Sequence, residues 1–215
     1  MNRHKELLRL LHGDHDPYRN FPAGEWNTKW VAWGSSHPWF QETIRLVRPR
    51  TIIEVGTFTG ASAIHMAKYL EAENLEAAVI CVDTFLGGID HWTSARELLG
   101  AHFGRPSIYY EFLSNVINHK QQSRIVPFPL DSLNAARFFK HIGLSAEMVY
   151  IDGSHERGDV RRDLEMYWPL VNGGGAMLID DITGHFPGVV QDVDEFCSGA
   201  GLKLETNAEK GILRK

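Results

Sequence analysis

Residues 51–62 read Thr-Ile-Ile-Glu-Val-Gly-Thr-Phe-Thr-Gly-Ala-Ser, an apolar run that breaks at Gly56 and passes Gly60 into a helical pattern. This order predicts a buried strand, a glycine-bearing turn and the first turn of a helix. Glycine lets a ligand approach the backbone closely, and the first N–H groups of a helix favour an anion. The segment therefore predicts a binding site for a nucleotide-like ligand.

The spacing of the two glycines argues against a dinucleotide. A dinucleotide-binding turn requires Gly-x-Gly-x-x-Gly, whereas this chain has Gly56-x-x-x-Gly60 with an acid, Glu54, inside the strand. That spacing suits a smaller anion, such as the carboxylate of a cofactor that carries an amino acid. A nicotinamide-dependent oxidoreductase remains an alternative, because Asp83 could bind a ribose in either case.

Composition narrows the class of protein. The chain has 215 residues, of which 43% are hydrophobic, and a formal net charge of −5. It lacks a dense Lys/Arg block and an apolar run of ~18 residues, so we expect neither a nucleic-acid partner nor a membrane span. Two cysteines and an N-terminus unlike a signal peptide favour a reducing cytoplasm. Assembly into a homo-oligomer stays open.

Helical and strand-like segments alternate from about residue 36 onward. We expect an α/β fold, a Rossmann-like, doubly wound and mostly parallel seven-stranded sheet with helices on both faces. Gly173-Gly174-Gly175 is expected to end the helix at 157–171. The expected strands are 51–57, 78–85, 124–130, 148–151 and 176–180 with two short strands in 202–213, and the expected helices are 38–47, 61–71, 94–99, 109–120, 132–142, 157–171 and 187–198.

Acidic residues follow the predicted strands. Asp83, Asp131, Asp152 and the pair Asp180-Asp181 each come at the carboxyl end of a strand, where ligands of parallel sheets bind. Asp is also common in turns and helix caps. Five such residues at one edge of the sheet favour a site.

Two segments are harder to assign. Residues 1–37 are expected to form an N-terminal cap, and 38–215 the ligand-binding domain. The tryptophans at 26, 30, 33 and 39 favour either packing on the sheet or an aromatic wall over a pocket. The insert 86–106, with His91, Trp92, His102 and Phe103, is either a wall of the same pocket or a loop packed on itself.

Four motifs occur in an order that resembles the class I S-adenosylmethionine-dependent methyltransferases. They are Glu-Val-Gly-Thr-Phe-Thr-Gly-Ala-Ser-Ala from Glu54, Val-Asp-Thr-Phe from Val82, Tyr-Ile-Asp-Gly-Ser-His from Tyr150 and Leu-Ile-Asp-Asp from Leu178. The chain is most similar to the small metal-dependent O-methyltransferases, both the catechol type and those that modify natural products and sugars. The resemblance covers roughly residues 38–215.

This resemblance implies roles for residues that bind S-adenosyl-L-methionine. Asp83 would accept hydrogen bonds from both ribose hydroxyls, and Ser62 would bind the carboxylate of the cofactor. Ser132 would either read the adenine edge with Asp131 or cap a helix. The full implied set is Glu54, Gly56, Thr57, Gly60, Ser62, Asp83, Thr84, Asp131 and Ser132.

The resemblance also implies a metal site and a general base. Asp152, Asp180 and Asp181 match three oxygen ligands of a divalent cation, with Mg²⁺ expected and Mn²⁺ or Ca²⁺ as alternatives. The catechol-type enzymes carry Asp-Asn where this chain has Asp180-Asp181, so direct binding by both stays open. His155 matches the residue that takes the proton of the acceptor hydroxyl.

The implied activity is metal-assisted O-methyl transfer to a hydroxyl of a small molecule or sugar. Two alternatives stay open, a hydroxylase or oxidoreductase on the same sheet and a cofactor-binding module without catalysis. The retention of Asp152, His155, Asp180 and Asp181 together argues against lost catalysis.

Overall fold

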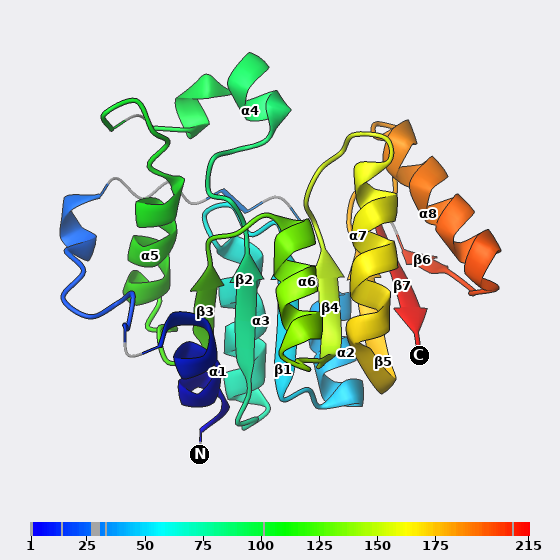
Figure 1. Ribbon diagram of the computed structural model, residues 1–215, viewed down its shortest axis with the longest axis horizontal. Helices are drawn as coiled ribbons and strands as arrows, with labels where there is room; N and C mark the ends of the chain where they lie inside the picture. Colours follow the sequence, from blue (N-terminus) through cyan, green and yellow to red (C-terminus); the bar gives the residue numbers. More distant parts are fainter. Residues whose placement is uncertain (1, 14, 27–30, 33, 101, 208) are drawn as a thin grey trace.

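The computed structural model describes residues 2–13, 15–26, 31–32, 34–100, 102–207 and 209–215. Their strands form a seven-stranded sheet in the order β3-β2-β1-β4-β5-β7-β6 (Figure 1). Strands β1 to β5 pair in parallel, and β7 is antiparallel to β5. This arrangement confirms the predicted fold. The strands are β1 (Thr51–Val55), β2 (Ala78–Val82), β3 (Ile125–Phe128), β4 (Ala146–Ile151), β5 (Val171–Ile179), β6 (Glu205–Asn207) and β7 (Lys210–Arg214).

Helices cover both faces of the sheet because its central strands are apolar on both sides. All five residues of β1 are buried, as expected for a strand between two helical layers. One layer contains α1 (Arg3–His12), α6 (Ser132–His141), α7 (Asp159–Tyr167) and α8 (Pro187–Ala200), and the other contains α2 (Pro38–Val47), α3 (Ala61–Ala72) and α5 (Ile108–Asn118). None of the helices described is long and apolar enough to cross a membrane.

The N-terminal segment contributes to the main core. Leu7 of α1 is fully buried against β2 and β3, and the His12 ring lies 2.6 Å from the carbonyl oxygen of Pro127. A short 3-10 helix (Ala23–Glu25) follows, and Trp26 stacks on Tyr110 of α5 with ring centroids 4.3 Å apart. Trp30 and Trp33 lie outside the described residues.

Gly173, Gly174 and Gly175 do not end a helix, so that prediction is wrong. The helix ends as α7 at Tyr167, a 3-10 turn (Trp168–Leu170) follows, and the three glycines lie inside β5. A Cβ added at Gly175 would lie 2.5 Å from the Glu147 carbonyl oxygen, beside the register shift between β4 and β5. Glycine therefore allows a close approach of strands here.

The helix predicted at 94–99 is also misplaced. The structure has α4 (Ile89–Thr93) followed by a 3-10 turn (Arg96–Leu98). Ser94 ends α4, because its N–H donates to the Asp90 carbonyl oxygen at 2.8 Å. The α4 segment lies above the carboxyl ends of the strands (Figure 1).

The loops after β1 and β4 meet at Gly56. This residue has a φ of +81°, and an added Cβ would lie 1.9 Å from the Asp152 carbonyl oxygen. A side chain there would overlap the backbone of the neighbouring loop, so both the conformation and the contact require glycine.

Gly56→Ala should therefore cost more than backbone strain alone. Gly143 is a matched control, because its φ is +67° and an added Cβ would meet no described atom within 4 Å. We expect Gly143→Ala to lower the free energy of unfolding by about 1 kcal/mol and Gly56→Ala by more than about 3 kcal/mol. Urea unfolding measures both, and equal losses would contradict the close contact.

Candidate functional site

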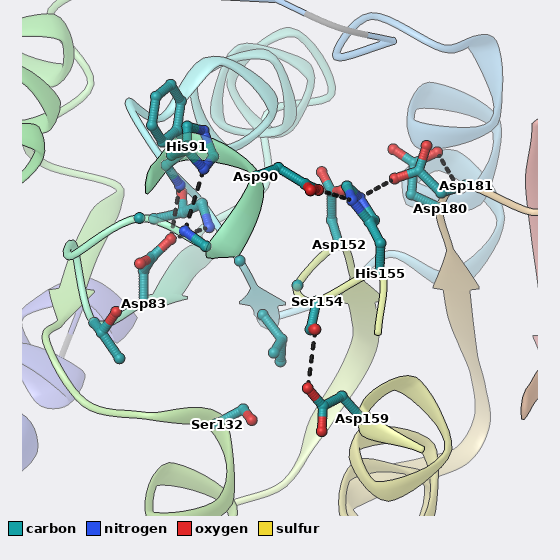
Figure 2. Close-up of a pocket in the computed structure, with 18 of the residues that line it drawn as sticks. Asp83, Asp90, His91, Ser132, Asp152, Ser154, His155, Asp159, Asp180 and Asp181 are labelled. Carbon is teal, nitrogen blue, oxygen red and sulfur yellow. Dashed lines mark hydrogen bonds and ion pairs between the residues drawn. The ribbon is translucent and has the colours of Figure 1, made fainter. Parts of the chain in front are cut away.

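A cavity of about 810 Å³ opens at the carboxyl ends of β1, β2, β4 and β5 (Figure 2). Among the predicted site residues, only Glu54 and Gly60 do not line it. The structure thus brings together the glycine turn, the acidic strand ends and the predicted base. The predicted residues that line the cavity are Gly56, Thr57, Ser62, Asp83, Thr84, Asp131, Ser132, Asp152, His155, Asp180 and Asp181.

Asp83 holds the glycine turn in place. One carboxylate oxygen accepts N–H groups from Thr57 (2.9 Å) and Phe58 (2.8 Å), and the other accepts that of Phe85 (2.7 Å). Desolvation raises the pKa of Asp83, and these three donors oppose that rise. The residue is thus positioned at the end of β2, on the wall of the cavity.

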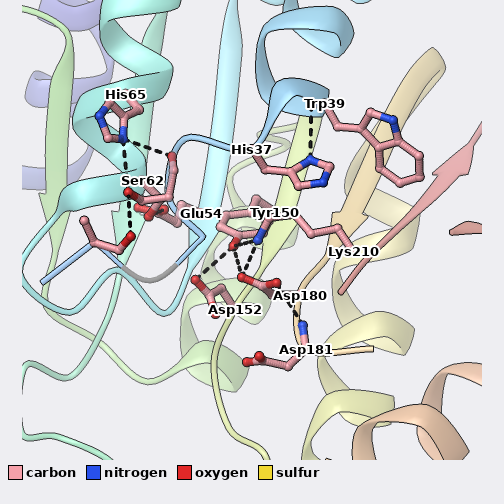
Figure 3. Close-up of polar contacts among 12 residues, drawn as sticks. His37, Trp39, Glu54, Ser62, His65, Tyr150, Asp152, Asp180, Asp181 and Lys210 are labelled. Atoms are coloured by element: carbon pink, nitrogen blue, oxygen red, sulfur yellow. Dashed lines mark hydrogen bonds and ion pairs between the residues drawn. The ribbon is translucent and has the colours of Figure 1, made fainter. Parts of the chain in front are cut away.

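Glu54 lies beneath the turn. Its side chain is fully buried and accepts hydrogen bonds from the Thr57 hydroxyl (2.5 Å) and the Ser62 hydroxyl (Figure 3). Burial raises the pKa of Glu54 to about 7. Since Glu54 does not line the cavity, it supports the turn through Thr57 and Ser62.

The start of α6 borders the opposite side of the cavity. Asp131 is the N-cap and accepts the N–H of Asn134 at 3.0 Å, which lowers the pKa of Asp131. Ser132 is the first helical residue, so Asp131 takes the capping role that was the alternative for Ser132. Both residues still face the cavity.

Three aspartates converge at the ends of β4 and β5. Asp152, Asp180 and Asp181 each offer a carboxylate oxygen, and these oxygens lie within 4.8 Å of one another. Burial, and next the charge of Asp180, raises the pKa of Asp152 well above its usual range. Carboxylates this close require a counter-charge, and an all-oxygen set fits a hard divalent cation such as Mg²⁺.

A buried lysine lies behind this cluster, which sequence reasoning missed. Lys210, at the start of β7, is 1% exposed, and its ammonium lies 2.5 Å from Asp180 Oδ2 (Figure 3). The Tyr150 hydroxyl donates to Asp180 and lies 3.0 Å from Asp152 Oδ2. Lys210 was overlooked because a single lysine in a C-terminal strand carries no motif.

His155 lies between two carboxylates. Its Nε2 is 2.7 Å from Asp181 Oδ2, and its Nδ1 is 3.3 Å from Asp90 Oδ2. The imidazole stacks on Phe186 with ring centroids 4.0 Å apart. The hydrogen bond of the imidazole to Asp181 is the main cause that raises the pKa of His155, and Asp90 adds to it. Sequence reasoning did not identify Asp90, which lies 65 residues away.

The insert 86–106 is divided between the cavity and the surface. Asp90 and His91 of α4 line the cavity, and His91 stacks on Phe58 of the glycine turn at 4.7 Å. Trp92 and Phe103 are exposed. The tryptophans described in the N-terminal region, Trp26 and Trp39, are not among the cavity-lining residues.

Comparison with known proteins identifies the family of this chain. A family model described as a methyltransferase domain matches residues 53–182, from the middle of β1 to just beyond β5. This chain belongs to that methyltransferase family. The matched residues include the glycine turn, Asp83, the acidic cluster and His155.

Solved structures share the fold of this methyltransferase-family chain. The O-methyltransferase from Bacillus cereus, in complex with SAH, has a TM-score of 0.58 at 14% identity and covers 100% of this chain and 91% of its own. The O-methyltransferase NovP has a TM-score of 0.62 at 18% identity, and the match covers 99% of this chain and 97% of the NovP chain. An uncharacterized protein of Sinorhizobium fredii, y4gI, is 25% identical over 154 residues, 70% of this chain. The match spans 15% of that curated relative.

The raised pKa of Glu54 predicts a pH-dependent stability. With a folded pKa of about 7 against 4.5 when unfolded, the folded state binds more protons between these values. The free energy of unfolding should therefore fall as pH rises from about 4.5 to 7, by about 2–4 kcal/mol. Glu54→Gln removes this titration, and the glutamine side chain can still form hydrogen bonds with the Thr57 and Ser62 hydroxyls.

Urea unfolding at pH 5 and pH 8 measures the effect. Glu54→Gln should gain stability relative to the parent at pH 8, whereas the exposed control Glu42→Gln should not. If the free energy of unfolding depended on pH in the same way for the parent and for Glu54→Gln, Glu54 would not be protonated in the folded state.

Proposed function

We propose that this chain catalyses S-adenosylmethionine-dependent, divalent-metal-assisted methyl transfer to a hydroxyl of a small molecule or sugar. The observation that carries the proposal is the composition of one cavity. It contains the glycine turn with Asp83 on one wall and Asp152, Asp181 and His155 on another. A cofactor bound by the first set would lie beside an acceptor bound by the second.

The residues of the glycine turn suit the cofactor. Gly56 lines the cavity at the end of β1, and the first N–H groups of α3 favour a carboxylate. Asp83, held by three N–H donors, offers two oxygens at the end of β2 for a pair of ribose hydroxyls. Asp131 and Ser132 border the region left for the adenine.

The acidic cluster and His155 suit the transfer step. S-adenosylmethionine would supply a methyl group on a sulfonium, and a cation at the cluster of Asp152, Asp180 and Asp181 would make a nearby hydroxyl more acidic. His155, in its neutral form, takes the hydroxyl proton while the new C–O bond forms and the C–S bond breaks. Asp181 and Asp90 hold the two ring nitrogens in this structure, and one of these contacts has to give way to the acceptor hydroxyl before the ring can take its proton.

Asp83→Ala tests the cofactor half of the proposal. Removing the carboxylate deletes the acceptor for a ribose and releases the Thr57 and Phe58 N–H groups. We expect the affinity for S-adenosylhomocysteine to fall by about 1.5–3 kcal/mol, roughly 10–150-fold. Calorimetric titration measures it.

Thermal melting provides the control for that titration. S-adenosylhomocysteine should raise the melting temperature of the parent, and NAD should not. Unchanged affinity in Asp83→Ala would remove Asp83 from the site. Stabilisation by NAD alone would favour an oxidoreductase.

His155→Ala tests the reaction half, using labelled S-adenosylmethionine and a panel of hydroxylated acceptors with Mg²⁺ or EDTA. We expect transfer to require Mg²⁺ and the single-turnover rate to fall by roughly 10²–10⁴-fold in the variant. The parent rate should rise with pH as His155 loses its proton, at a higher pH than for an ordinary histidine, because Asp181 and Asp90 favour the imidazolium and raise its pKa.

Asp90→Asn serves as the matched variant, since it removes one of the groups that raise this pKa. It should move the rising limb of the pH profile to lower pH. A His155→Ala enzyme with the parent rate and pH profile would show that His155 is structural. Full transfer in EDTA would exclude the metal from the reaction.

A further inference from the structure

The ammonium of Lys210 is enclosed by the protein on the side of Asp180 away from the cavity. It lies 2.5 Å from Asp180 Oδ2 and 3.0 Å from the Tyr150 hydroxyl. The rings of Tyr150 and Phe40 have centroids 5.1 and 5.4 Å from it. Its neighbour Glu209 lines the cavity and Lys210 does not. The charge of Lys210 is therefore directed at the acidic cluster and not at a ligand.

This placement divides the three aspartates by charge. A buried ammonium is costly unless it is paired, and its ion pair with Asp180 neutralises both groups. Asp152 and Asp181 then remain at the cavity wall as the carboxyl groups available to a cation. When both are ionised, their two negative charges match one divalent cation.

Asp180 also connects the other two aspartates. Its Oδ1 accepts the N–H of Asp181 at 2.9 Å. Its Oδ2 accepts the Tyr150 hydroxyl, which also lies 3.0 Å from Asp152. A fixed Asp180 therefore orients Asp152 and Asp181 from behind.

We propose that Lys210 is a positioning residue for the metal site. Its ammonium neutralises Asp180, keeps the three aspartates together in the metal-free protein, and leaves Asp152 and Asp181 as the charges that hold a divalent cation. The inference rests on the metal role in the proposed function. It predicts that Lys210 weakens metal binding while it stabilises the metal-free fold.

Manganese binding to the full chain tests the proposal without any measure of activity. Lys210→Met leaves three unneutralised carboxylates, so we expect Mn²⁺ to bind roughly tenfold tighter or more. Its melting temperature in EDTA should fall and recover with Mn²⁺. Asp180→Asn should bind Mn²⁺ more weakly, because the ammonium is then unpaired. The double variant restores the charge balance and should return to within about threefold of the parent affinity.

Lys203→Met is the matched control, because Lys203 is exposed in the segment before β6. It should change neither the Mn²⁺ affinity nor the melting temperature in EDTA. Calorimetric titration and thermal melting measure all five proteins. If Lys210→Met does not fold, the double variant still decides the matter, since the proposal requires it to bind Mn²⁺ like the parent.

Three results would overturn the role of Lys210. The first is unchanged or weaker Mn²⁺ binding in Lys210→Met. The second is loss of Mn²⁺ binding in the double variant, which would make Asp180 a direct ligand. The third is an equal effect of Lys203→Met on the Mn²⁺ affinity and the melting temperature. A parent that binds no Mn²⁺ would contradict the metal part of the proposed function. In that case, Mn²⁺ binding by Lys210→Met would still support the proposal that the charge of Lys210 opposes metal binding. Absence of Mn²⁺ binding in both proteins would overturn that proposal.

Discussion

The backbone contact between Gly56 and Asp152 joins the two halves of the site. Gly56 donates its N–H to the Val82 carbonyl oxygen at 2.9 Å, and Asp152 donates its N–H to the Val55 carbonyl oxygen at 2.8 Å. The ends of β1, β2 and β4 are thereby held in one backbone network. The glycine turn and the acidic cluster are thus in direct backbone contact, with no space for a side chain at Gly56 between them.

A second constraint on the structure is that several carboxylates are gathered, and largely buried, at the wall of the cavity and beneath it. Each carboxylate has a defined set of donors: backbone N–H groups for Asp83, hydroxyls for Glu54, and Tyr150 with Lys210 for Asp180. Buried carboxylates persist only when donors or cations offset their desolvation. The electrostatics of the site therefore extend into the core, beyond the residues that line the cavity.

Sequence patterns predicted the sheet and most of its elements because apolar runs and their turn residues are local signals. They were wrong where the same residue type is typical of two different local structures. Gly173 to Gly175 resembled a helix terminator but lie in β5, where the close approach of β4 requires glycine at Gly175. Ser94 resembled a helix start but ends α4, whose short length gave little periodicity.

The sequence alone determined that Asp83, Asp152 and Asp180 would lie near one another, since parallel strands end at one edge of a sheet. Only the tertiary structure decided which charges face them. Lys210 and Tyr150 are 60 residues apart, and Asp90 and His155 are 65 apart. No periodicity within a single strand or loop encodes such a pairing, because it depends on which strands become neighbours and where the connecting segments cross the sheet edge.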